Sequence, residues 1–203
     1  MGALLITTSL VCISARGNAA PNTAPPLAGS WDIDPMHTEV TFTIQHLLIS
    51  EVQGRFSQLG GTIVADPAHL SKSSVQFTIQ ATSVDTQVAL RDTDLRKKDY
   101  FDVADYPTIT FVSTKISKAK PGSANPYVAL GNLTIKGVTL PIALPFTING
   151  PILDPWKTPR FGLISHIVID RTKFGVGGSE FGMLGKTVTI DISLEATPSK
   201  KAA

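Results

Sequence analysis

The four histidines are the first residues of this chain that could do chemistry, as metal ligands or as proton donors and acceptors. They lie far apart, and none pairs with another at the short spacing that places two imidazoles on one metal ion. We therefore predict no metal site and no cofactor. The residues concerned are His37, His46, His69 and His166.

His46 is the histidine with a possible binding role. It follows Val40, Phe42 and Ile44 at alternate positions, so a strand that continues to this point turns its imidazole to the same side. It would then meet a ligand's head group near the mouth of the fold. A core histidine satisfied by a backbone partner is the alternative, and the pattern alone favours it.

Charged residues gather at Arg91, Asp92 and Asp94. A guanidinium there could clamp a phosphate or carbonyl head group, but charges in turns and short helices more often pair locally. Asp170 and Arg171 are interpreted as fastening the loop that follows them to the fold. These groups supply no catalytic residue.

A glycine-rich run from Gly175 to Gly185 invites comparison with a phosphate-binding loop. Such loops open a helix, whereas a strand pattern follows here, so a mobile hairpin connection or entrance flap is predicted. Ser179 within the run lacks the flanking glycines of a nucleophile elbow. No Ser, His and acid set is found elsewhere, and we predict no enzyme activity.

Composition indicates one medium-sized folded domain. The chain has 203 residues, of which 42% are hydrophobic and 17% charged, enough to bury a substantial core. Its 18 Lys and Arg balance 16 Asp and Glu, and the basic residues are scattered. No nucleic-acid partner is therefore predicted.

The chain begins with a short apolar run, Met1 to Ala15, followed by small residues. It predicts a signal peptide over residues 1–20 and export to the periplasm or outside the cell; a plain disordered leader is the alternative, because no Lys or Arg precedes the run. Cleavage would remove Cys12 and leave neither a thiol nor a stable membrane anchor. The rest of the chain is predicted to consist of a linker at 21–27, one barrel domain at 28–197 and a disordered tail at 198–203.

Alternating apolar and polar residues dominate the domain and predict half-buried β-strands. Pro141 and Pro145 alternate with apolar residues in one of these stretches, which favours an edge or seam because proline cannot donate to a ladder. Only Gln87 to Phe101 suggests a short helical crossover. The expected strands lie near 30–33, 39–45, 54–64, 75–81, 108–111, 127–135, 140–148, 161–169 and 188–194.

About eight strands, apolar on one face, form either a sandwich or a closed antiparallel barrel. Closure removes the exposed edges. A barrel of this size is either filled by its own side chains or holds one small ligand, and the pattern leaves both possibilities open.

One stretch of the sequence resembles the signature of the YceI-like family. Shorter motifs around Gly54, Gly131 and Asp170 agree in order, and the resemblance spans about residues 30–196. It departs at Asp94, where many relatives have His, and around Met183 to Lys186, where an acidic residue is common. The matching residues are Arg91, Asp92, Leu95, Phe101, Asp102, Val103, Tyr106, Pro107, Ile109, Thr110 and Phe111.

The resemblance implies an all-β, extended lipocalin-like antiparallel barrel. It further implies a periplasmic, often dimeric protein whose tunnel takes a polyisoprenoid or another long-chain lipid. The working hypothesis is a lipid carrier or scavenger. Two rival functions remain: a filled barrel that acts as a stress-related interaction module, and an enzyme that acts on an isoprenoid. The predicted ligand-binding residues are Phe42, Ile44, His46, Phe56, Phe77, Ile79, Arg91, Phe111 and Phe146.

Overall fold

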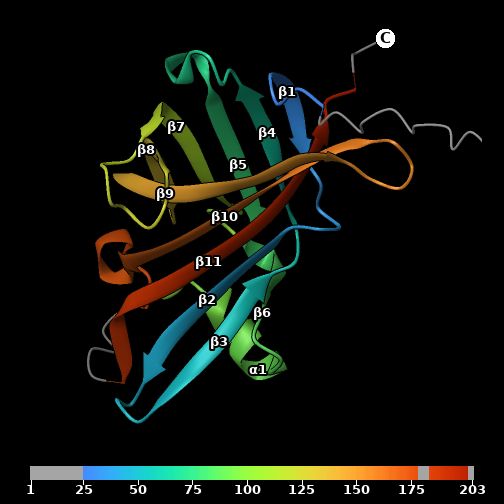
Figure 1. The fold of residues 1–203 in the computed structure, drawn as a ribbon. Helices are drawn as coiled ribbons and strands as arrows, with labels where there is room; N and C mark the ends of the chain where they lie inside the picture. Colours follow the sequence, from blue (N-terminus) through green and yellow to red (C-terminus); the bar gives the residue numbers. More distant parts are fainter. Residues whose placement is uncertain (1–24, 178–182, 201–203) are drawn as a thin grey trace, which may run out of the picture.

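The computed structural model describes residues 25–177 and 183–200, an almost entirely β-stranded domain (Figure 1). The predicted signal peptide, most of the linker and Ser179 lie outside the described residues. The strands are β1 (Gly29–Ile33), β2 (Glu39–His46), β3 (Ser50–Phe56), β4 (Leu59–Ala65), β5 (Ser74–Gln80), β6 (Val84–Asp85), β7 (Thr108–Lys118), β8 (Tyr127–Ile135), β9 (Val138–Leu153), β10 (Pro159–Asp170) and β11 (Leu184–Pro198). The helices are α1 (Ala89–Leu95) and the 3-10 turns η1 (Leu70–Lys72), η2 (Ala81–Ser83) and η3 (Arg171–Phe174).

Eight of the strands close into an antiparallel barrel, as predicted. β1 pairs with both β4 and β11 and thereby closes the ring. Each of these eight strands then has a neighbour on both sides along at least part of its length, which shortens the edge open to another molecule. The order around the ring is β1, β4, β5, β7, β8, β9, β10 and β11.

The remaining strands extend the barrel at one end. β11 is 15 residues long and changes partner along its length: its first part pairs with β2, and its last residues pair with β1. β3 and β6 continue the sheet beyond β2, and α1 follows β6 at the lower end of Figure 1. The helical crossover predicted between Gln87 and Phe101 is therefore confirmed.

The alternating pattern explains which side chains face inward, but in β7 it is interrupted. Ile109 and Phe111 are buried at odd positions, but the next buried residue of the strand is Ile116. The pairing with β8 shifts between Ser113 and Lys115, because a β-bulge inserts one residue and exchanges the two faces. The alternation of apolar and polar residues therefore predicts the inward-facing side chains of β7 only as far as this bulge.

Pro141 and Pro145 lie at a seam of the barrel. β9 pairs with β8 from Val138 to Phe146, whereas its pairing with β10 begins only at Phe146. Both prolines therefore fall in a segment with one strand neighbour, as predicted. The carbonyl oxygen of Pro145 instead accepts a 2.7 Å hydrogen bond from Ser165 Oγ of β10.

Residues at both ends of the described domain contact the barrel. Leu27, predicted to belong to the linker, packs against the core, and its carbonyl oxygen accepts from Trp31 Nε1. At the other end β11 includes Pro198, and Ser199 Oγ donates to Asp32. In the described part of the chain, no helix has the length and apolar character needed to cross a bilayer.

Candidate functional site

The barrel encloses a cavity of about 810 Å³. Its wall is built mainly from aliphatic and phenylalanine side chains of β2 to β5 and β7 to β11. The cavity answers a question that the sequence left open: the barrel is hollow rather than filled.

All nine residues predicted to bind a ligand lie in the cavity wall. That they contact a ligand stays a prediction. They come from β2, β3, β5, β7 and β9 and from α1, so the fold brings together positions more than a hundred residues apart. They are Phe42, Ile44, His46, Phe56, Phe77, Ile79, Arg91, Phe111 and Phe146.

Phenylalanine rings line much of the cavity. Phe77 and Phe111 face each other across β5 and β7. The ring centroid of Phe56 lies 5.7 Å from that of Phe42 and 5.6 Å from that of Phe101. Sequence analysis did not assign Phe101 to the site, because it lies in the irregular segment between α1 and β7, where alternation gives no direction.

At the end near α1, the cavity wall becomes polar. Thr86 and Asp92 are buried, and Asp92 Oδ1 accepts from the Thr86 backbone N–H at 2.8 Å and from Thr86 Oγ1 at 2.5 Å. Arg91 Nε donates to the same Thr86 Oγ1 at 2.7 Å, and Arg91 Nη2 donates to the Thr86 carbonyl at 2.8 Å. One buried threonine therefore holds both the guanidinium and the carboxylate in place.

The charged group predicted from Arg91, Asp92 and Asp94 is thus divided. Arg91 and Asp92 are joined through Thr86, whereas Asp94 forms an exposed ion pair with Lys97 at 2.6 Å. Local pairing was the favoured interpretation, and the structure agrees. Thr86 was missed because an isolated threonine carries no signal in the sequence.

His46 lies at the same end of the cavity, at the last position of β2. Its side chain is half-buried and lines the cavity. Within residues 25–177 and 183–200, no hydrogen-bond partner holds its ring. In the described residues, His46 is therefore not a core histidine held by a backbone group, which was the alternative.

The opposite end of the cavity has a different polar set. Asp66, Ser73 and Lys118 line it there, near η1 at the top of Figure 1. A hydrogen bond from the His69 backbone N–H, together with nearby positive charge, lowers the pKa of Asp66. The cavity therefore extends along the barrel, with charged groups near both ends and an apolar middle.

Arg171 anchors the loop after β10, as predicted. Its side chain is buried and donates to the carbonyl oxygens of Val176 at 2.6 Å, Gly185 at 2.8 Å and Leu184 at 3.3 Å. Asp170 accepts hydrogen bonds from Thr172. These contacts tie η3 to the start of β11.

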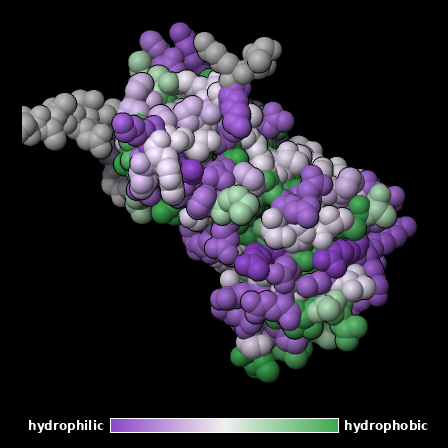
Figure 2. Space-filling model, turned by 90° about the vertical axis from the view of Figure 1, so that its right-hand side faces the viewer, coloured by the Kyte–Doolittle hydropathy of each residue, from purple (hydrophilic) through white to green (hydrophobic). Residues whose placement is uncertain are grey.

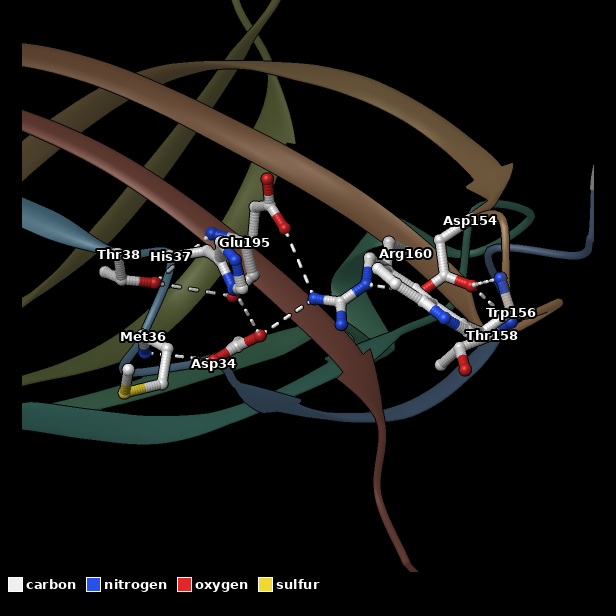
Figure 3. Close-up of polar contacts among 9 residues, drawn as sticks. All are labelled: Asp34, Met36, His37, Thr38, Asp154, Trp156, Thr158, Arg160 and Glu195. Atoms are coloured by element: carbon white, nitrogen blue, oxygen red, sulfur yellow. Dashed lines mark hydrogen bonds and ion pairs between the residues drawn. The ribbon is translucent and has the colours of Figure 1, made fainter.

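A second polar cluster lies outside the cavity, around Arg160 (Figure 3). Arg160 Nη1 lies 2.8 Å from Asp34 and 3.3 Å from Glu195, and Nε lies 2.9 Å from Asp154. The cluster joins the loop after β1, the β9–β10 turn and β11. It therefore fastens together three parts of the chain at one end of the barrel.

Part of this cluster has the composition of a cation site. The ligand atoms of Asp34, His37 and Glu195 lie within 4.8 Å of one another. The Arg160 guanidinium, however, already pairs with both carboxylates and supplies the positive charge that a metal would provide. We therefore interpret the group as an ion-pair network, which the sequence did not predict.

The Arg160 network changes the acidity of its carboxyl groups. Burial raises the pKa of Asp34, but hydrogen bonds from Arg160, His37 and the Met36 backbone N–H outweigh it, and the pKa falls to about 2. The hydrogen bond from Arg160 is also the main cause of the lowered pKa of Asp154. Asp34 therefore remains ionised until the pH falls toward about 2, and Arg160 favours the ionised form of Asp154 as well.

Comparison with known proteins identifies relatives of the whole barrel. The model of a family described as a YceI-like domain matches residues 31–196. A relative named UPF0312 protein, from Pseudomonas savastanoi pv. phaseolicola, is 34% identical over 188 residues, which make up 92% of this chain and 95% of the relative.

Solved structures show the same architecture. The crystal structure of Burkholderia cenocepacia BcnA has a TM-score of 0.71 and 28% identity, over 81% of this chain and 99% of that one. A domain from Saccharophagus degradans, described as polyisoprenoid-binding and implicated in plant cell wall breakdown, has a TM-score of 0.62 and 17% identity, over 83% of this chain and 98% of the domain. At that identity the likeness concerns the fold alone.

Proposed function

Because the chain belongs to the family of YceI-like domains, we propose that it binds a long-chain isoprenoid, or another amphiphilic lipid, inside the barrel. It would carry or sequester this molecule in the periplasm or outside the cell. The observation that carries the proposal is the cavity of about 810 Å³ with its apolar middle. A protein of the same fold is described as polyisoprenoid-binding, which supports the proposal.

The cavity volume sets the size of the ligand. It lies in the upper part of the range of about 300–1,000 Å³ found for small-molecule sites. A single long-chain ligand is therefore the expected occupant.

Burial of the chain is expected to supply most of the free energy of binding. Each methylene contributes about 0.8 kcal/mol, so about twenty carbons contribute on the order of 15 kcal/mol. Association costs roughly 4 to 15 kcal/mol, and the difference is compatible with useful affinity. Because the apolar chain supplies most of it, selectivity for the head group is expected to be loose.

An enzyme acting on an isoprenoid is the rival function. Ser50 and His46 face each other across β3 and β2 and both line the cavity. Among the described residues, however, no hydrogen bond joins them and no carboxylate orients the imidazole, so the arrangement lacks the parts of an activated nucleophile. We therefore favour binding without turnover.

Native mass spectrometry of the protein purified from its own host tests the proposal, followed by solvent extraction and identification of any bound molecule. A stoichiometric isoprenoid or other long-chain lipid is the expected result, and the same spectra test the predicted homodimer. An empty protein that also takes up no added isoprenoid from detergent solution contradicts the proposal. Chemical change of the added isoprenoid during incubation would favour the enzyme instead.

A further inference from the structure

The turn between β2 and β3 carries three consecutive exposed apolar side chains. Leu47, Leu48 and Ile49 have 45%, 74% and 84% of their surfaces exposed. Hydrophobic side chains also mark the lowest point of the molecule in Figure 2, at the level of this hairpin and α1 in Figure 1. We call Leu47, Leu48 and Ile49 the hairpin tip.

The hairpin tip breaks the usual rule for turn residues. The Ile49 N–H donates to the His46 carbonyl at 3.2 Å, which closes a turn with Leu47 and Leu48 at its centre. Both leucines have positive φ, 51° and 60°, a conformation that in two-residue turns normally selects Asn, Asp or Gly. A turn that keeps leucine where a polar residue or glycine fits better is a mark of a functional site.

The hairpin tip is continuous with the polar end of the cavity. The residues on either side of it, His46 and Ser50, both line the cavity. Met183, 48% exposed, accepts a 2.7 Å hydrogen bond from the Leu47 N–H and also lines the cavity. Leu90 of α1, 81% exposed, lines the same end. Exposed apolar side chains therefore border the cavity where an amphiphile's head group would lie.

We propose that the hairpin tip, with Leu90 and Met183, docks the protein on the surface of a lipid bilayer, so that an isoprenoid passes between the membrane and the cavity. This inference rests on the proposed function, because it supplies the route by which the ligand enters. A bilayer suits this surface better than a protein does. A few protruding aliphatic side chains cover much less than the roughly 800 Å² per partner that a stable protein interface buries.

The expected attachment is weak and reversible. A single myristoyl chain binds bilayers with a constant of only about 10⁴ M⁻¹, and a small set of aliphatic side chains on a convex turn is comparable. Such an affinity allows the protein to load at the membrane and leave it again, as a carrier must.

The test uses the full chain and vesicles of phosphatidylethanolamine and phosphatidylglycerol. The double variant Leu47→Asn, Leu48→Gly introduces the pair that this turn geometry prefers, so it removes the apolar side chains without disturbing the fold. The matched control, Ile152→Thr with Ile164→Thr, removes two other exposed apolar residues, from the barrel wall. Each protein is measured for co-sedimentation with vesicles, for isoprenoid uptake from vesicles and for uptake from detergent solution.

The wild type and the control are expected to bind vesicles. For the tip variant, both vesicle binding and isoprenoid uptake from vesicles should fall at least tenfold. Its uptake from detergent should stay within twofold of the wild type. Equal vesicle binding by the tip variant and the wild type would overturn the docking proposal while leaving the proposed function intact. Failure of the wild type to take up isoprenoid from detergent would instead refute the proposed function, and the inference with it.

A second measurement locates the contact directly. Tryptophan placed by Ile49→Trp should be quenched by vesicles whose acyl chains are brominated, whereas tryptophan placed by Val168→Trp on the barrel wall, 57% exposed in the native protein, should not. Equal quenching of the two would also overturn the proposal.

Discussion

Phe42 on β2 and Gly54 on β3 face each other across the hairpin, and the Phe42 ring occupies the space where a side chain at position 54 would lie. A Cβ atom at position 54 would contact the Phe42 ring and would lie 2.8 Å from the Thr86 methyl group. The absence of a side chain at one residue therefore sets the position of a ring in the cavity wall. It also links that ring to the threonine that holds Arg91.

The first prediction follows from this contact. Gly54→Ala should displace the Phe42 ring and reduce isoprenoid affinity severalfold, with some loss of stability, because a well-packed site resists an added methyl group. Titration with a fluorescent isoprenoid and a thermal melt measure the two effects. Gly60→Ala is the control, since nothing lies within 4 Å of its added Cβ; equal behaviour of the two variants would contradict the prediction.

The second prediction concerns the apolar wall. Phe111→Glu places a carboxyl group in the cavity and should lower isoprenoid affinity at least tenfold, about 1.4 kcal/mol, because an unpaired charge is costly in an apolar site. Val112→Glu, next to it on the same strand but 44% exposed in the native protein, should bind normally. Circular dichroism verifies that both variants are folded. Normal uptake by folded Phe111→Glu would show that this wall does not hold the ligand.

The third prediction separates head-group contacts from chain contacts. His46→Phe should lower the affinity for an isoprenoid with a hydroxyl or carbonyl head group by about fivefold, which corresponds to the loss of one hydrogen bond of about 1 kcal/mol. A hydrocarbon without a head group, such as squalene, should bind both proteins alike. Competition titrations measure the ratio, and equal losses for the two ligands would mean that His46 acts only through packing.

The fourth prediction concerns acid stability. The pKa of Asp34 falls from 3.8 to about 2 in the folded protein, so the folded state loses its proton more easily and this group stabilises the protein above pH 3.8. That contribution disappears as the pH falls through about 2. Arg160→Gln should therefore lower the melting temperature most above pH 4, and the difference from the wild type should shrink between pH 4 and 2. A difference that does not change with pH would show that Arg160 stabilises the fold through packing alone.

Inward and outward faces could be predicted wherever a strand keeps one regular partner. Val40, Phe42 and Ile44 point to the cavity because successive side chains of a strand alternate. The same reasoning stopped in β7, where the bulge near Thr114 exchanges the faces. It also gave no direction for Phe101, which lies outside the strands.

The polar contacts were less predictable. Arg160, Asp34 and Glu195 are separated by up to 161 residues of chain, and no local pattern connects them. The hairpin tip had a visible signal: three consecutive apolar residues stand where a turn should be polar. Sequence analysis did not use that signal.

The sequence by itself determined an all-β domain, its family and most of the residues that face inward, because alternation and short motifs are local properties of the chain. Only the tertiary structure decided that the barrel is hollow, since the volume left inside depends on how far opposite walls stand apart. It also decided how the barrel closes: β11 is long enough to pair first with β2 and then with β1. Both features depend on contacts between residues distant in the chain, which no local pattern specifies.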